Sequence, residues 1–139
     1  MKKITLLFVL LSLVIVVAAG AQENKKGHPI DQWLGKCIQQ DESTAGMRNC
    51  TAQAYGMWDK ELNKAYKSLM NNLSPDGKIA LKNSQLAWIK YRDAESKFND
   101  EVTALKGGTL YLLMGDSSRL EMVKERTLEL QRFIVILDE

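Results

Sequence analysis

The chain has 139 residues, of which 45% are hydrophobic, and its 19 basic and 17 acidic side chains leave a formal net charge of +2. A charge so close to zero gives no electrostatic reason to bind nucleic acid or an anionic membrane surface. One histidine and two cysteines are too few for most transition-metal sites. We therefore expect no nucleic-acid partner, no metal and no other cofactor.

The first 21 residues have the pattern of a secretory signal peptide. Lys2 and Lys3 precede an apolar run over residues 4–17, and Ala-Gly-Ala at 19–21 gives the small-residue cleavage pattern. The alternative is a membrane anchor, but a run of about 14 residues is shorter than the ~20 that a spanning helix needs. We predict cleavage near Ala21, a periplasmic or secreted location, and no stable membrane insertion afterwards.

After cleavage the chain would lose Lys2 and Lys3, so its formal charge would fall from +2 to zero. About 118 residues would remain, which is the size of one domain. Residues 22–28 are polar and are expected to form a loose leader. Residues 29–139 are expected to form a single helical domain.

The only two cysteines are Cys37 and Cys50. In an oxidising compartment, two cysteines in a small domain are most simply one structural disulfide. Their spacing is not that of a C-x-x-C redox motif. Closing a loop of this length is expected to stabilise the fold by about 3 kcal/mol in the chain-entropy model.

Apolar residues recur with helical spacing from Pro29 onward, and Pro29 suits a first helical turn. Ser43 or Thr44 can cap a second helix over residues 45–72. Ser74-Pro75 marks the start of a third helix, over residues 75–105. Because the connection is short, the second and third helices are predicted to form a long antiparallel hairpin.

Gly107-Gly108 is expected to end the third helix. Residues 110–114 are predicted to form one or two helical turns that plug an end of the bundle. Residues 115–117 are predicted to form a turn. Ser118 and Glu121 have the spacing of a capping box for a final helix. No segment alternates with period two, so the predicted fold is all-α, a small antiparallel bundle.

Three tryptophans, Trp33, Trp58 and Trp88, each lie on an apolar stripe and are predicted to belong to the core. The apolar end of the final helix, residues 133–137, is compatible with packing inside the bundle or against another copy of the chain.

Side chains on the two predicted long helices form a candidate polar seam. Asp59, Asn63 and Tyr66 share one face of the second helix. Gln85, Trp88 and Arg92 share one face of the third, with Tyr91 and Asp93 beside it. We predict that Arg92 meets Asp59, while Asn63 and Gln85 satisfy polar groups around them. Since buried polar groups need specific partners, the seam is interpreted mainly as structural, fixing the register of the helices. The alternative is a ligand or partner site.

No catalytic motif is present in the sequence. There is no phosphate-binding glycine loop and no G-x-S-x-G nucleophile elbow. The carboxylate pairs Asp41-Glu42 and Asp100-Glu101 are sequence neighbours, which point in different directions on a helix and so do not indicate a glycosidase site. We predict that the protein is not an enzyme.

The same motifs carry a family resemblance. Residues 59–66 resemble the D-x-x-L-N-x-x-Y core, and residues 85–93 the Q-x-x-W-x-x-Y/F-R-D segment, of the LprI-like lysozyme-inhibitor domain family. Cys37, Cys50, the Gly-Gly-Thr at 107–109 and Arg126 also resemble family positions. Many relatives carry a further cysteine before the last helix. Because this cysteine is absent here, no second disulfide is expected to constrain residues 110–114.

The resemblance implies a small helical envelope protein that inhibits lysozyme in some members. We expect such an inhibitor to present a loop to the substrate cleft of lysozyme and exclude peptidoglycan. Asp41, Glu42 and Asp116 are the acidic loop positions predicted to meet a cationic lysozyme. The alternative is a periplasmic helical interaction module without a lysozyme partner, which an exposed apolar patch would favour.

Overall fold

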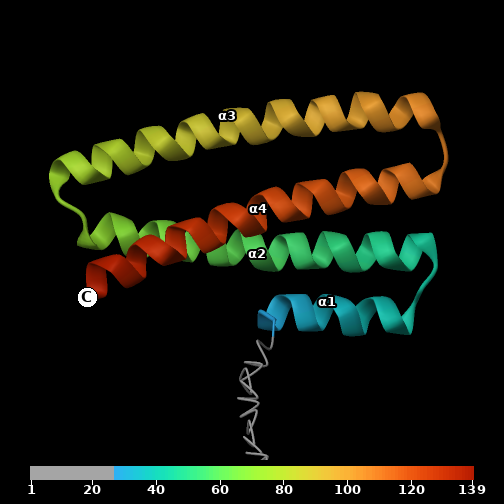
Figure 1. The fold of residues 1–139 in the computed structure, drawn as a ribbon, viewed down its shortest axis with the longest axis horizontal. Helices are drawn as coiled ribbons and strands as arrows, with labels where there is room; N and C mark the ends of the chain where they lie inside the picture. The colour runs from blue at the N-terminus through green and yellow to red at the C-terminus, as the bar shows by residue number, and fades with distance from the viewer. Residues whose placement is uncertain (1–26) are drawn as a thin grey trace, which may run out of the picture.

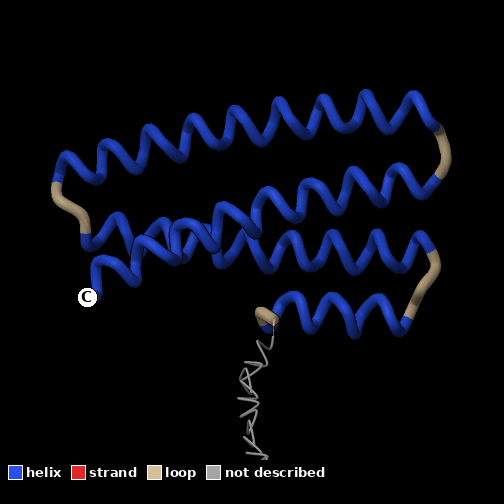
Figure 2. Tube along the Cα trace, in the orientation of Figure 1, coloured by secondary structure: helices blue, strands red, loops and turns tan. Residues whose placement is uncertain are grey.

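The computed structural model describes residues 27–139, which form four α-helices and no strand (Figures 1 and 2). They are α1 (Pro29–Gln40), α2 (Thr44–Asn72), α3 (Pro75–Lys106) and α4 (Thr109–Asp138). The predicted all-α class is confirmed. The predicted signal peptide, its cleavage site and residues 22–26 of the leader lie outside the described residues. No helix among residues 27–139 is long and apolar enough to cross a membrane.

The helices begin and end where local chemistry requires. The hydroxyl of Ser43 accepts a hydrogen bond from the Gly46 N–H (3.0 Å), and that of Ser74 accepts one from the Gly77 N–H (3.2 Å). Each bond satisfies a first-turn donor that has no partner within the helix. After α3, Gly107 and Gly108 have φ of 65° and 89°, a conformation that ends the helix and that other residues rarely adopt.

The helices are arranged side by side in the order α3, α4, α2, α1 (Figure 1). The largest interface joins α4 to α2, the next joins α4 to α3, and α1 packs on α2. The predicted hairpin of α2 and α3 therefore has the correct connection and direction. Its two helices, however, pack against the intervening α4 and make little contact with each other.

The core lies between α2 and α4. Its buried hydrophobic residues are Ala54, Trp58, Leu62, Ala65 and Leu69 from α2, and Leu120, Val123 and Leu130 from α4. Trp58 is fully buried, and Trp33 and Trp88 are half-buried against this core, so all three tryptophans pack as predicted. The long helix α3 contains no buried residue, and much of its apolar surface remains open to solvent.

The predicted plug and turn before the last helix are wrong, because α4 runs without interruption from Thr109 to Asp138. Leu110, Leu112 and Met114 are exposed on its first turns. Gly115 is buried inside the helix, where a glycine costs only about 1 kcal/mol relative to alanine. The packing and ion pairs of this segment outweigh that cost.

His28 also departs from the prediction, since it is not part of a loose leader. Its Nδ1 accepts a hydrogen bond from the Ile30 N–H (3.2 Å) and caps α1. Its ring lies 4.2 Å from the ring of Trp58, measured between centroids. The ordered domain therefore begins before Pro29.

Candidate functional site

A disulfide closes the turn between α1 and α2. Cys37 near the end of α1 is bonded to Cys50 in the second turn of α2, with Cα atoms 5.9 Å apart, as predicted. Cys50 is buried. The three residues of the turn, 41–43, are therefore held between two helices that are covalently linked, at one end of the bundle (Figure 1).

Within this turn the two predicted acidic residues differ in role. The Asp41 carboxylate accepts a hydrogen bond from the Ser43 N–H (3.0 Å), and bonds from the side chain and backbone of Ser43 lower the pKa of Asp41. A Cβ on Gly46 would collide with the Asp41 carboxylate, so this carboxylate packs over the first turn of α2. Glu42 is exposed and has no hydrogen bond or ion pair within residues 27–139. Both carboxylates are exposed, and Glu42 is the one without a hydrogen bond or ion pair within these residues.

Asp116, the third predicted loop acid, does not lie in a loop. It is in α4, its side chain is 18% exposed, and it pairs with Arg48 of α2 (2.6 Å) and Arg119 of α4 (2.8 Å). Arg119 also contacts Asp100 of α3 (2.5 Å). This network joins α2, α4 and α3, and the predicted loop position of Asp116 is wrong.

The network makes the fold sensitive to acid. Burial alone would raise the pKa of Asp116, but hydrogen bonds from Arg48 and Arg119 and their charges lower it below its usual value. A carboxyl with a lowered folded pKa stabilises the fold above its unfolded pKa, about 3.9, and loses that contribution as pH falls through its folded pKa.

We expect Asp116→Asn to reduce the free energy of unfolding at pH 6 by about 1–3 kcal/mol, because it leaves Arg48 and Arg119 without their shared carboxylate. The difference between the variant and the wild type should shrink toward pH 3. Urea unfolding of both proteins at pH 3 and pH 6 measures this difference in the free energy of unfolding. An equal difference at pH 3 and pH 6 would contradict the role assigned to the ionised carboxylate.

The predicted pairing of Asp59 with Arg92 is wrong. Asp59 instead accepts a hydrogen bond from Asn63 within α2 (3.2 Å), and Arg92 pairs with the adjacent Asp93 (2.6 Å). The Arg92 guanidinium also lies 5.3 Å from the centroid of the Trp88 ring. The residues of the predicted seam are therefore divided between α2 and α3, with α4 in the space where they were expected to meet.

The remaining seam residues have separate environments. Tyr66 packs against the core, and Gln85 contacts α4. Tyr91 is exposed and lines a groove described below.

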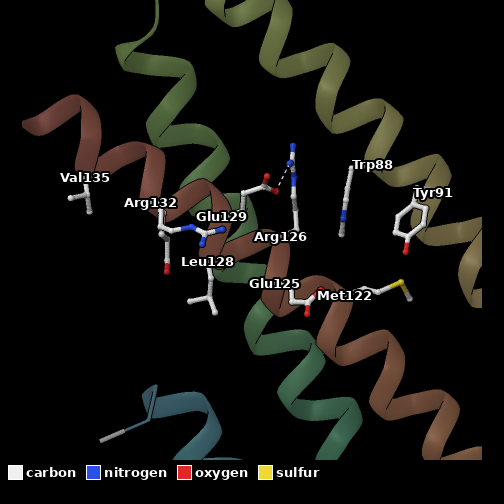
Figure 3. A pocket seen from close by; sticks show the side chains of 10 residues that line it. Trp88, Tyr91, Met122, Glu125, Arg126, Leu128, Glu129, Arg132 and Val135 are labelled. Carbon is white, nitrogen blue, oxygen red and sulfur yellow. Dashed lines mark hydrogen bonds and ion pairs between the residues drawn. The ribbon is translucent and has the colours of Figure 1, made fainter. Parts of the chain in front are cut away.

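The buried polar contact between helices centres on Arg126, which is only 8% exposed. From α4 its guanidinium donates to the Gln85 side-chain oxygen (3.1 Å) and the Ser84 hydroxyl (3.0 Å) of α3. It also pairs with Glu129 of α4 (2.7 Å), as Figure 3 shows. Reasoning from the two motifs alone missed this partner. The sequence feature that indicates this partner is the position of Arg126 among the periodic apolar residues of the last helix.

Replacing Arg126 by Met should weaken the attachment of α3 to α4. We expect a loss of about 2–4 kcal/mol in the free energy of unfolding, because the change removes a charged donor with three partners while preserving most of the packing. Arg132→Met, an exposed arginine on the same helix, is the control and should cost less than about 0.5 kcal/mol. Equal losses in the two variants would show that the buried contacts do not stabilise the fold.

Two concave surfaces adjoin these networks. The larger, about 840 Å³, is an open groove between α3 and α4 (Figure 3), lined by Trp88, Tyr91, Met122, Glu125, Arg126, Leu128, Glu129, Gln131, Arg132 and Val135. The smaller, about 410 Å³, lies between α2 and α4, with Arg48, Tyr55 and Arg119 among its lining residues. Within residues 27–139, no three or more His, Cys, Asp or Glu side chains are grouped so that they could hold a metal ion.

These observations define the class: a small all-helical protein whose first two helices are joined by a disulfide, with an exposed acidic turn and an open apolar groove. The family model described as "Lysozyme inhibitor LprI" matches residues 37–130. The chain therefore belongs to the LprI lysozyme inhibitor family.

Among solved structures, the chain is similar to the crystal structure of an uncharacterized protein from Burkholderia thailandensis. The two are 28% identical with a TM-score of 0.75, and the match covers 81% of this chain and 56% of that chain. This chain thus spans little more than half the length of that relative. No curated protein matches the chain.

Proposed function

We propose that this protein is an exported, non-catalytic inhibitor that binds lysozyme and blocks its peptidoglycan cleft. The observation that carries the proposal is the family match, which extends from the disulfide to the core of α4. The signal-peptide pattern of the first 21 residues supports export to the compartment where peptidoglycan and lysozyme meet.

The disulfide-closed turn is the element best suited to enter a cleft. It is short, it lies at an end of the bundle, and both helices that flank it are fixed by the disulfide and by the Ser43 cap. A turn that is already ordered loses little conformational entropy on binding, which favours affinity. We therefore assign the contact with lysozyme to residues 41–43, with Glu42 as the contacting carboxylate.

The charge of Glu42 would act mainly on the rate of association. Removing Lys2 and Lys3 with the signal peptide makes the formal net charge zero, so attraction to a cationic lysozyme must come from local carboxylates rather than from the whole molecule. Exchanging such a charge at the rim of an interface typically changes the association rate and its salt dependence.

The test is titration of the processed, oxidised protein against a panel of lysozymes, with binding read by calorimetry and inhibition by cell-wall clearing. Glu42→Lys should weaken binding to a cationic lysozyme about tenfold at low salt. Asp76→Lys makes the same charge change at an exposed site beside the α2–α3 turn and should leave binding unchanged. If the two variants bind alike, the turn is not the contact.

A folded sample that binds no lysozyme would overturn the inhibitor proposal. The second candidate would then stand: a helical interaction module of the cell envelope without a lysozyme partner. The observation that favours this candidate is the exposed apolar surface of α3 and α4, where Phe98, Leu105 and Leu110 are each at least 60% exposed.

A further inference from the structure

The exposed side of α3 carries a regular stripe that the bundle leaves open to solvent. Its residues alternate in steps of four and three, and all are exposed: Ala80, Ser84, Ala87, Tyr91, Ala94, Phe98, Glu101 and Leu105. We call this set the α3 stripe. A 3.5-residue repeat of apolar positions is the pattern by which one helix pairs with another in a coiled coil.

The helix α4 does not cover the α3 stripe. Ser84, at the edge of the α3 stripe, accepts a hydrogen bond from Arg126 of α4. The other α3 side chains that contact α4, such as Gln85 and Asn99, lie on the neighbouring side of the helix. The stripe is continued by α4 side chains rather than hidden by them, since Tyr91 shares the open groove with Leu128 and Val135 (Figure 3). A contiguous exposed apolar surface of this kind marks an interaction site.

Side-chain size along the stripe changes from one end to the other. The outer part of the first half carries the small residues Ala80, Ser84 and Ala87, and the outer part of the second half carries the large residues Phe98 and Leu105. Beside the centre the order is reversed, with the large Tyr91 in the first half and the small Ala94 in the second. A partner helix that complements this stripe must be large where α3 is small and small where α3 is large. The same helix running in the opposite direction has that property.

An antiparallel pairing of two α3 helices, centred between residues 92 and 93, brings opposite sizes together. Ala80 meets Leu105 of the second copy, and Ala87 meets Phe98 of the second copy. Tyr91 lies opposite the second copy's Ala94. The only two polar positions of the stripe, Ser84 and Glu101, also meet each other. A parallel pairing would instead place Phe98 on Phe98 and leave Ala80 facing Ala80.

The charges of α3 favour the same direction. Residues 75–92 carry four basic side chains and one acidic one, and residues 93–106 carry four acidic side chains and two basic ones. The first half therefore has a net charge of +3 and the second half −2. Antiparallel helices place these halves against each other, whereas parallel helices would place like charges together.

We propose that two copies of this protein pair through the α3 stripe as an antiparallel coiled coil. The stripe extends over 25 residue steps, about 38 Å of helix, which is long enough for a continuous helix–helix interface. This arrangement covers the large exposed side chains of the stripe, Tyr91, Phe98 and Leu105, and leaves the disulfide-closed turn of each copy free. The proposal does not depend on lysozyme binding.

The first test is the molar mass of the processed protein by light scattering and sedimentation over a range of concentrations. We expect a dimer, and we expect Phe98→Glu to raise the dimer dissociation constant at least 30-fold, as loss of an interface anchor does. Leu86→Glu is the matched control, because Leu86 is 50% exposed on another side of α3 and should leave the dimer intact. Circular dichroism checks that both variants are folded.

A wild-type protein that stays monomeric at several hundred micromolar would overturn the proposal, as would equal loss of the dimer in the two variants. In a monomeric wild type, loss of lysozyme binding in Phe98→Glu alone would assign the stripe to lysozyme instead. The lysozyme titration of Glu42→Lys is read separately, so failure of the dimer and failure of the inhibitor proposal are distinguishable.

Crosslinking tests the direction of the helices. In the antiparallel pair, Ala94 of each copy lies near the centre, while the two Ala80 residues are about 38 Å apart along the helix axis. With both native cysteines in a disulfide, Ala94→Cys should crosslink between copies with a short bis-maleimide and Ala80→Cys should not. Efficient crosslinking of Ala80→Cys would overturn the antiparallel arrangement.

Discussion

Trp58→Ala is expected to lower the free energy of unfolding by about 3–5 kcal/mol, which is the usual cost of removing a large buried aromatic side chain. Trp58 is 0% exposed and belongs to the core between α2 and α4. The His28 ring packs against the Trp58 ring at an interplanar angle of 34°, and Lys124 lies 5.9 Å from the Trp58 ring centroid. The cavity left by alanine would therefore weaken the packing of α1 as well as that of α2 on α4.

Urea unfolding followed by circular dichroism measures this loss, and Trp58→Phe refines its interpretation. The indole N–H of Trp58 is buried and has no hydrogen-bond partner within residues 27–139. Phenylalanine removes this unsatisfied donor while retaining much of the volume, so we expect a cost of only about 1–2 kcal/mol. A cost for Trp58→Phe as large as that for Trp58→Ala would show that the indole N–H makes a stabilising contact, such as one to a bound water.

Removing the disulfide with Cys37→Ala and Cys50→Ala together should lower the free energy of unfolding by about 3 kcal/mol. The bond closes a loop of 13 residue steps, and its absence lets the unfolded chain sample more conformations. Urea unfolding of the oxidised wild type and the double variant measures the effect. Reduced wild-type protein should match the variant, which controls for packing changes at the two alanines.

The same variant links stability to the proposed function. Without the disulfide, the turn over residues 41–43 is held only by the Ser43 cap and by the packing of α1 on α2. Its loss of preorganisation should weaken lysozyme binding about tenfold, measured by calorimetry at a temperature where the variant is folded. Unchanged affinity in the folded variant would place the lysozyme contact elsewhere on the surface.

Sequence periodicity by itself does not identify the partner of the α3 stripe. Tyr91, Phe98 and Leu105 recur at heptad spacing, and such a pattern predicts a face that packs against another helix. Within one chain this face is exposed. The periodicity reports that a partner helix is expected, but it carries no information on whether that partner belongs to the same molecule.

The polar-seam prediction failed for the same reason, because the sequence does not identify which helix packs against a given face. The helical spacing of Asp59 and Asn63, and of Gln85 and Arg92, indicates which side chains share a face. It does not indicate which helix lies opposite that face. With α4 between α2 and α3, Gln85 binds Arg126, and Asp59 and Arg92 find partners on their own helices.

The sequence by itself determined the features that depend on neighbouring residues. The start of α2 at the Ser43 cap, the start of α3 at Ser74-Pro75 and its end at Gly107-Gly108 follow from hydrogen bonding and φ preferences within a few residues. The disulfide followed from the presence of only two cysteines and the expected compartment. Only the tertiary structure decided that α4 continues through Gly115 and that Asp116 is an interhelical ion-pair residue rather than part of an acidic loop. The physical reason is that contacts from Arg48 and from the packed face of α2 stabilise a helical conformation that local propensity alone would interrupt.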